Sequence, residues 1–326
     1  MERHQIEYFV AIVEHGGFGR AARALCTAQP SLSRAIQRLE RELGVTLFHR
    51  VGRNAVLSSA GEALVEKARL VLRDLDALHA AARSIGDGVA GRVDVAATSS
   101  SALEPVTSVV ADLRERHPGV TVSVTPALSA SEVVAMVLRG HCEVGVCGNS
   151  GPPAAQGLQA RHLRDEEILL VLPSDEVVEA GGGVTPEVLR GRRFVVPQPP
   201  TAVRAVFDRL AATVGDMTIA AEVGDRSVIL PMVLRGIGAG LVPDGWSDLA
   251  RRAGARLYPF TPPERLPQWL VHRRGPLTPA ARAFIDATMQ WALTDAGSGR
   301  GVADTGSETS WGTGSRLPEA PPGDSD

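Results

Sequence analysis

The sequence predicts an α/β chain with two parts, a small helical domain followed by a larger body of alternating strands and helices. Residues 1–58 show apolar side chains at helical spacing and then a short hairpin pattern, whereas residues 89–296 alternate apolar strands with amphipathic helices. Between them, residues 59–88 form one long helix pattern without proline. Aromatic residues make up only 4% of the chain, so we expect cores built mainly from Ala, Val and Leu.

Three helices and then a hairpin are predicted in the first domain. Residues 18–25 and 29–43 form the second and third helices, and Gly44 ends the third because glycine accepts the backbone conformation of a helix C-terminus. Residues 45–57 alternate apolar and polar side chains around a Gly-Arg-Asn turn, which predicts a hairpin. The apolar faces of the first and third helices are carried by Ile6, Phe9, Val10 and Val13 and by Leu32, Ile36 and Leu39.

This order of elements is typical of a winged helix-turn-helix, in which the third helix enters the major groove of DNA. Pro30 fits the first turn of that helix, where its missing N–H costs nothing. Gln29, Ser31, Ser33 and Arg34 lie at or near its exposed N-terminal end. Gln can form two hydrogen bonds to adenine, Arg binds guanine or phosphate, and Ser reaches base or phosphate. We therefore expect these side chains to contact DNA.

The charge of the first domain agrees with an anionic partner. Residues 1–61 contain eight Arg and five Glu, although the whole chain has a formal net charge of −3. A solvated charged surface would explain the same numbers without a partner, so charge alone leaves both interpretations open.

The cysteines and the apolar runs indicate the compartment. Cys26, Cys142 and Cys147 form no C-x-x-C pair and lie near no His cluster with metal spacing, so we expect reduced thiols and no metal. We also expect no secretion signal and no membrane span, because the N-terminus and the apolar runs lack those patterns. The expected location is the cytoplasm.

The long helix carries a heptad pattern. Leu64, Val71, Leu78 and Ile85 recur every seven residues, and Ala68, Leu75 and Ala82 fall four residues after the first three. Such a seam favours a coiled coil between two subunits, and packing on its own domain is the alternative.

The body begins with a strand-helix pattern that favours a parallel sheet covered by helices. Strands are predicted at 93–97, 120–124 and 143–147, with helices at 104–116 and 130–139 between them. A second run has strands at 168–172, 194–196, 220–223 and 240–242, helices at 201–214 and 227–236, a late strand at 268–271 and a last helix opening at Thr278-Pro279. Residues 297–326 are rich in Gly, Ser, Thr, Pro and acid, which predicts a disordered tail.

The first domain closely resembles the LysR-type transcriptional regulators over about sixty residues, and the body resembles them in layout. The matching residues are Phe18, Ala21, Ala22, Leu25, Gln29 to Ser33, Ile36, Leu39, Glu40, Leu43, Gly44, Leu47 to Arg50 and Ser59 to Gly61.

The resemblance implies roles for individual residues. Gln29, Pro30 and Ser33 align with recognition-helix contacts and Arg34 with a phosphate contact, while Arg50 and Arg53 lie in the wing that reaches the DNA backbone and minor groove. We also count Arg38 among the residues expected to contact DNA. The alternative is that Arg38 is a solvated charge on the surface of the helix.

Two residues depart from the family pattern. Gly17 and Ala28 stand where the family usually has capping hydroxyls, so each helix loses a cap worth about 1 kcal/mol. A shifted helix start capped by Thr27 is an alternative at the second position.

The resemblance also implies a two-lobed, periplasmic-binding-protein-like body with an effector between its Rossmann-like lobes. Ser99, Ser100, Ser129 and Thr201 follow strands and precede helices, where hydroxyl and N–H groups suit a carboxylate. Arg226 would add a positive charge to pair with an acid. Ordinary helix capping is the alternative for each hydroxyl.

We therefore expect a DNA-binding transcriptional regulator controlled by a small-molecule effector, with a small organic acid as one candidate. The alternatives are a small-molecule binding protein without a DNA role and an enzyme with a DNA-binding appendage; no catalytic motif supports the latter, so we expect no enzyme and no cofactor. The expected partners are double-stranded DNA with an interrupted inverted repeat, RNA polymerase and further copies of the chain in a dimer or tetramer.

The expected domain boundaries follow the same assignment. The winged domain covers residues 1–58, the dimerising helix covers 59–88 and the tail covers 297–326. The effector domain covers 89–296, with lobe I at 92–160 and 267–296 and lobe II at 161–266.

Overall fold

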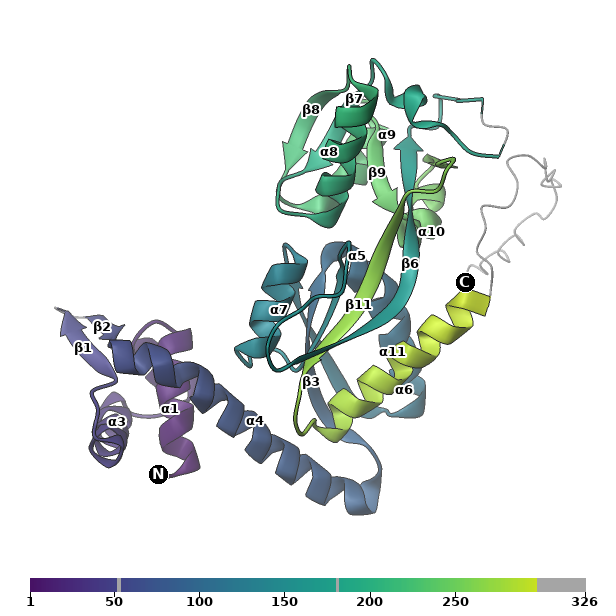
Figure 1. Ribbon diagram of the computed structural model, residues 1–326. Helices are drawn as coiled ribbons and strands as arrows, with labels where there is room; N and C mark the ends of the chain where they lie inside the picture. The colour runs from purple at the N-terminus through teal and green to yellow at the C-terminus, as the bar shows by residue number, and fades with distance from the viewer. Residues whose placement is uncertain (52–53, 180–181, 298–326) are drawn as a thin grey trace, which may run out of the picture.

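A small N-terminal domain lies at one end of a long helix, and a two-lobed body lies at the other (Figure 1). The computed structural model describes residues 1–51, 54–179 and 182–297. The predicted tail at 297–326 lies outside these ranges except for its first residue. Within the described residues, no helix is both long and apolar enough to cross a membrane.

The N-terminal domain consists of three helices and a hairpin, as predicted. They are α1 (Arg3–Glu14), α2 (Phe18–Ala24), α3 (Gln29–Leu43), β1 (Phe48–Val51) and β2 (Asn54–Leu57). The two strands are antiparallel, with Phe48 opposite Leu57. The three helices bury a common core because each carries apolar residues on one face, among them Phe9, Ile12, Ala21, Leu32, Ile36 and Leu39.

Neither α2 nor α3 has a side-chain cap at its start. Gly17 precedes α2, and Ala28 precedes α3 without any capping hydrogen bond. The alternative in which Thr27 caps a shifted start is wrong, because α3 begins at Gln29. At its other end, Gly44 has φ 68°, a left-handed conformation that glycine adopts without steric cost.

The long helix α4 (Ser59–Asp87) joins the two parts of the molecule. The hydroxyl of Ser58 caps it by accepting a hydrogen bond from the N–H of Gly61 at 2.9 Å. Leu64 and Ala68 of the predicted seam pack on the core of the N-terminal domain. Val71 and Leu78 continue the seam but are 40% and 65% exposed. The first part of the seam, at Leu64 and Ala68, therefore packs within its own domain. The later part, at Val71 and Leu78, is exposed to solvent and is called the open part of the seam below.

Lobe I contains the predicted βαβαβ unit. Its strands β3 (Ala90–Thr98), β4 (Gly119–Ala127) and β5 (Val144–Gly148) run parallel, with β3 in the middle. The helices are α5 (Ser99–Ser101), α6 (Thr107–Arg116), α7 (Ala130–Leu138) and α11 (Pro279–Gly297). The prediction of one helix at 104–116 is wrong at its start. Glu104 is extended (φ −141°, ψ 130°), within a short turn η1 (Ala102–Val106) that contains Pro105.

Two long strands cross between the lobes (Figure 1). They are β6 (Leu158–Leu172) and β11 (Arg265–Arg273), which pair antiparallel over most of their length. The sequence predicted only the last third of β6 and the middle of β11, because their other residues alternate with charged side chains. The antiparallel strands make the large sheet mixed rather than purely parallel.

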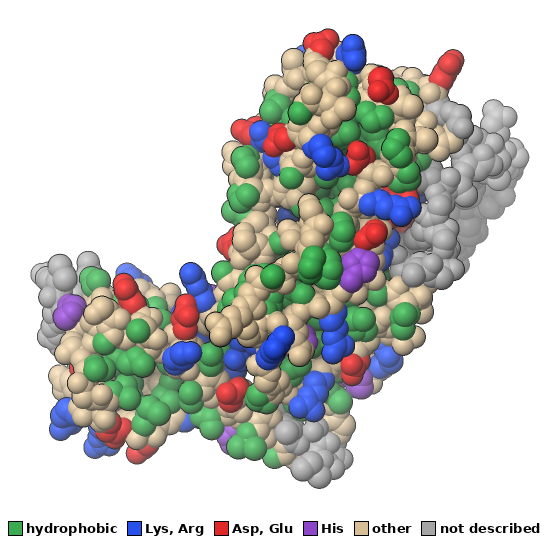
Figure 2. Space-filling model, viewed as in Figure 1, with side chains coloured by type: hydrophobic (Ala, Val, Ile, Leu, Met, Phe, Trp, Pro, Cys, Tyr) green, Lys and Arg blue, Asp and Glu red, His purple; other side chains and the backbone are tan. Residues whose placement is uncertain are grey.

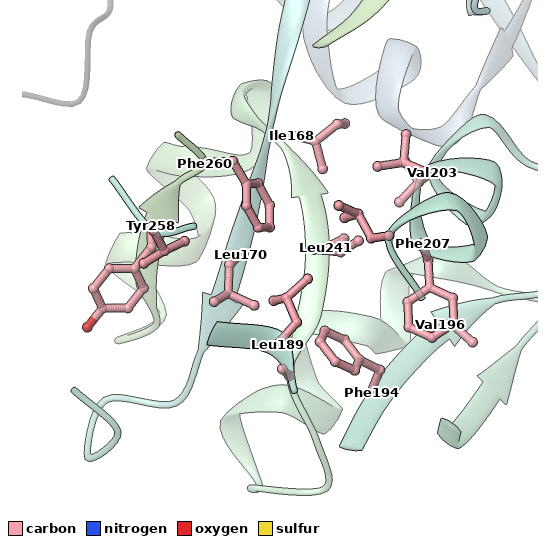
Figure 3. Close-up of a cluster of buried hydrophobic side chains, with 14 of the residues drawn as sticks. Ile168, Leu170, Leu189, Phe194, Val196, Val203, Phe207, Leu241, Tyr258 and Phe260 are labelled. Atoms are coloured by element: carbon pink, nitrogen blue, oxygen red, sulfur yellow. The ribbon is translucent and has the colours of Figure 1, made fainter. Parts of the chain in front are cut away.

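Lobe II is built around the far end of β6. Its strands are β7 (Arg193–Pro197), β8 (Thr218–Val223), β9 (Gly240–Pro243) and β10 (Arg256–Pro259), and its helices and turns are η2 (Pro186–Leu189), α8 (Ala202–Val214), η3 (Arg226–Val228), α9 (Ile229–Leu234), η4 (Asp244–Trp246) and α10 (Ser247–Arg252). Figure 3 shows its core, where Leu170 and Leu241 of the sheet face Phe207 of α8. Neither α10 nor β10 was predicted from the sequence.

Candidate functional site

The N-terminal end of α3 presents a polar surface held from behind by an apolar one. Gln29, Pro30, Ser31 and Arg34 are exposed, and Ser33 is half-buried. On the opposite side of the helix, three buried side chains anchor it in the core, namely Leu32, Ile36 and Leu39. Basic side chains project from the corner of the molecule where α3 lies (Figure 2), and those of α3 itself are arginines. The surface that would enter a groove is thus free of the protein's own body.

The three remaining predicted DNA contacts have different outcomes. Arg38 is exposed on α3, one turn after Arg34. The backbone of Arg50 lies in β1, but its side chain is outside the described part of the chain. Arg53 also lies outside the described residues. Contact of Arg50 and Arg53 with DNA through the wing therefore stays a prediction.

Two predicted effector residues from different lobes come together between the lobes. Nη1 of Arg226, in lobe II, donates to the hydroxyl of Ser100, in lobe I, at 3.5 Å, the long limit of a hydrogen bond. Arg226 is only 8% exposed, and its Nη2 is buried without a hydrogen-bond partner. Burial lowers the pKa of Arg226 from its ordinary value, because a low-dielectric environment disfavours the charged form.

Ser129 and Thr201 act as helix caps. The hydroxyl of Ser129 accepts from the N–H of Glu132 at 3.2 Å, and that of Thr201 accepts from the N–H of Arg204 at 3.1 Å. The capping alternative therefore describes both side chains. A hydroxyl that accepts one hydrogen bond as a cap can still form another, so contact of Ser129 and Thr201 with an effector stays a prediction.

An apolar cavity of about 650 Å³ lies between the lobes, next to the contact between Ser100 and Arg226. Of the five predicted effector residues, all of them described by the structure, Ser99 lines it, whereas Ser100, Ser129, Thr201 and Arg226 do not. Most of its wall is apolar and comes from both lobes, including Leu103, Val124, Leu230, Trp246 and Leu249. Sequence reasoning missed these residues because isolated apolar side chains look like core, and because α10 was not predicted.

A chain of buried polar side chains runs behind the cleft and into the crossing strands. The hydroxyls of Thr98 and Ser101 lie 2.9 Å apart, and Ser101 donates to Oε1 of Gln268 at 2.9 Å. The amide of Gln268 in β11 donates to the fully buried carboxyl of Glu166 in β6. Burial raises the pKa of Glu166 to about 8. Side chains near the cleft are thus linked to the two strands that connect the lobes.

The helix α4 is attached to lobe I by an arginine. Arg73 donates from Nε to the carbonyl of Gly140 and from Nη2 to the carbonyl of His141, each at 2.5 Å, and its Nη2 lies 3.4 Å from Asp94. Gly140 and His141 follow the C-terminal end of α7, whose N-terminal cap is Ser129. One short helix therefore connects the cleft side of lobe I with α4.

Comparisons with known proteins decide the family. The model of the bacterial regulatory helix-turn-helix proteins of the lysR family matches residues 3–62, and that of the LysR substrate binding domain matches residues 86–292. The chain belongs to the LysR family. It is similar to the transcriptional regulator IlvR of Caulobacter vibrioides, with 31% identity over 294 residues that cover 87% of this chain and 96% of IlvR. It is also 28% identical to XapR of Escherichia coli K12 over 288 residues, which cover 87% of this chain and 96% of XapR.

Solved structures of LysR-family regulators share the fold. A full-length OxyR variant from Pseudomonas aeruginosa superposes with a TM-score of 0.70 at 21% identity, covering 90% of this chain and 94% of that one. Full-length CbnR in complex with its target DNA gives a TM-score of 0.64 at 23% identity, covering 89% and 99%.

This LysR-family chain is therefore a DNA-binding transcriptional regulator with an effector-binding domain of two lobes. The alternative of a small-molecule binding protein without a DNA role is wrong, because the helix-turn-helix model matches the N-terminal domain.

Proposed function

We propose that α3 lies in the major groove with its N-terminal end against the bases. Gln29, Pro30, Ser31 and Ser33 would contact base edges, and Arg34 would bind phosphate. The observation that supports this is the exposed polar end of α3 above its buried apolar face. The other proposed contacts are with the DNA backbone and the minor groove, through Arg38, Arg50 and Arg53.

Two subunits would pair through the open part of the α4 seam. Val71 and Leu78 are exposed one heptad apart, and an apolar stripe of this kind is covered in a coiled coil. A dimer of this form places two α3 helices on the two halves of an interrupted inverted repeat. Pairs of dimers would form the tetramer and contact RNA polymerase.

The effector would bind between the lobes. Ser99, Ser100, Ser129, Thr201 and Arg226 are the proposed contacts, and the pairing of Ser100 with Arg226 across the lobes supports this placement. The proposed division keeps 1–58 for DNA, 59–88 for dimerisation and 89–296 for the effector. We propose a regulator without catalytic activity that acts in the cytoplasm, where its DNA is.

The DNA contacts can be tested by fluorescence anisotropy with the DNA upstream of the gene and with a scrambled duplex of equal length. Gln29→Ala should weaken binding to the upstream DNA by about 5- to 150-fold and hardly change binding to the scrambled duplex, because a lost base contact costs about 1–3 kcal/mol. Arg34→Ala should weaken both and lower the salt slope by about 1.

A matched control lies at the other end of the same helix. Arg41 is exposed there and hydrogen-bonds the carbonyl of Gln37, so Arg41→Ala should leave binding close to wild type. Equal losses for Gln29→Ala on both duplexes would show that Gln29 does not read bases.

A further inference from the structure

The buried guanidinium of Arg226 forms no ion pair with any residue that the structure describes. Among the described residues, its side chain forms a long hydrogen bond to Ser100, and Nη2 has no acceptor. Burying an unpaired charge destabilises a protein unless a partner supplies the opposite charge. Asp225, the adjacent acid, is exposed and its carboxylate accepts instead from the N–H of Ser227 at 2.9 Å. The described neighbours thus leave this cation uncompensated.

A second buried donor without a partner belongs to the wall of the neighbouring cavity. The indole Nε1–H of Trp246 has no acceptor, although Trp246 is only 8% exposed. Buried polar groups in native proteins are almost always hydrogen-bonded, so two such groups in one region need an explanation. Both groups are donors, and what they lack is an acceptor.

The cavity beside Arg226 suits an apolar group. Its walls include Leu103 from lobe I and Leu230, Trp246 and Leu249 from lobe II. Its volume of about 650 Å³ falls in the range of small-molecule sites. Ser99, Asp225 and Ser227 line this cavity. Ser100 and Arg226 do not line it, but each is adjacent in sequence to a residue that does, so their contact lies beside the cavity.

We propose that the effector is an amphipathic carboxylic acid, whose carboxylate binds Arg226 and Ser100 and whose apolar body fills the cavity between the lobes. This inference rests on the proposed effector function and names the chemical class that the site selects. It narrows the expected small organic acid to one with a bulky apolar group. A carboxylate held by Arg226 of one lobe and Ser100 of the other stabilises the closed arrangement of the lobes, because it interacts with both only when they are close.

The first test needs no ligand. Arg226→Met keeps most of the apolar bulk of the side chain and removes its charge. If Arg226 binds an anionic ligand, its unpaired charge destabilises the protein as long as no ligand is bound. The unliganded full-length variant, which lacks this charge, should therefore melt at the same temperature as wild type or higher. The matched control is Arg204→Met, which removes a cation that is already paired with Asp208 and Glu222 and should lower the melting temperature. A clear fall for Arg226→Met would show a structural arginine and overturn the proposal.

The second test uses acids and their amides as matched probes. Benzoate and benzamide, and octanoate and octanamide, are titrated into the full-length protein by calorimetry, with succinate as a polar acid. The apolar acids should bind better than their amides and better than succinate. Arg226→Met should weaken the acids by about 10- to 100-fold and leave the amides unchanged. No difference between acids and amides in wild type, or equal binding of the acids to both proteins, would overturn the proposal.

The failure of this inference can be distinguished from the failure of the proposed function. DNA binding by the same samples is measured by anisotropy in the absence of any acid. Loss of sequence preference there would contradict the proposed DNA contacts, whereas the calorimetric difference between acid and amide depends only on the cleft.

Discussion

The carboxylate of Glu40 accepts a hydrogen bond from the main-chain N–H of Leu47, at 2.8 Å. The same oxygen accepts from the N–H of Phe48 at 3.3 Å. Glu40 lies on α3, and Leu47 directly precedes the first strand of the hairpin. A side chain of α3 therefore fixes the start of the hairpin, so that the helix and the hairpin are held as one unit.

Replacing this carboxylate should loosen the wing. Glu40→Ala leaves two N–H groups without their acceptor, which costs about 1–3 kcal/mol when such groups are buried. Hydrogen exchange of the Leu47 and Phe48 amides should speed up by about 5- to 150-fold, since exchange follows the local opening free energy. Glu40→Gln retains an acceptor oxygen and should change exchange less. Unchanged exchange in Glu40→Ala would contradict this role.

Lobe I has no space for a side chain at Gly145. A Cβ there would lie 2.7 Å from Cγ2 of Val271 and would also overlap Val133, and both of these valines are fully buried. Gly145→Ala should therefore cost about 1–3 kcal/mol and lower the melting temperature by about 2 to 12 °C. Gly151→Ala is the control, because a Cβ there meets nothing within 4 Å. Equal melting temperatures for the two variants would show that the strand shifts freely.

The buried carboxyl of Glu166 should make stability depend on pH. Its pKa is raised from an ordinary value of 4.5 to about 8 by burial, which outweighs the opposing attraction of Arg164. Between these two values the folded protein holds a proton that the unfolded chain has released. The free energy of unfolding should therefore fall as pH rises from about 5 to 8.

Glu166→Gln removes this titration, so its melting temperature relative to wild type should rise with pH across that window. Glu167→Gln, at the neighbouring half-buried carboxylate that pairs with Arg265, is the control and should show no such trend. Parallel pH profiles for wild type and Glu166→Gln, measured by thermal denaturation, would contradict a raised pKa.

The open part of the α4 seam should hold the dimer together. Leu78→Glu removes an apolar side chain from each subunit, each worth about 1.5–3 kcal/mol when buried, so dissociation should become at least roughly 100-fold easier. His79→Glu introduces the same acid at the next exposed residue and serves as the control. Light scattering over a dilution series measures the effect. A dimer that survives Leu78→Glu unchanged would exclude this seam.

Arg73 should keep α4 on lobe I. Arg73→Met removes the hydrogen bonds to the carbonyls of Gly140 and His141. The expected result is a broader distance distribution between spin labels on α2 and on lobe II. Arg139→Met is the control, because its exposed pair with Glu66 at 3.3 Å is worth at most about 1 kcal/mol. Identical distributions for both variants would mean that other contacts fix the helix.

The N-terminal domain could be predicted from its sequence because each of its elements is encoded locally. Leu32, Ile36 and Leu39 repeat at helical spacing, and Gly44 ends the helix that they define. The polar end of α3 follows from the same periodicity, since an apolar stripe leaves the opposite face to solvent.

The effector cleft could be predicted only in part. Ser100 and Arg226 were expected separately, but their contact joins residues 126 positions apart, and no local pattern encodes it. The cavity next to them was not predicted, because Leu249 and Trp246 resemble core residues until the fold places them opposite the other lobe. The crossing strand β6 was predicted only from residue 168, since its first half carries Arg161, His162 and Asp165 toward solvent.

Two of the attachments of α4 to lobe I have a mechanical consequence. Arg73 and the glycine junction at Gly88 lie about 22 Å apart along the helix, which fixes its direction. With the arginine released, the remaining contacts, among them the exposed pair of Arg139 with Glu66, would hold the helix less firmly, and it could swing about the junction. Ser59 lies about 44 Å from this pivot, so a swing of about 10° would displace it by about 8 Å. Two base-pair steps of DNA span about 7 Å, so a modest rotation would carry the winged domain out of register with its half-site.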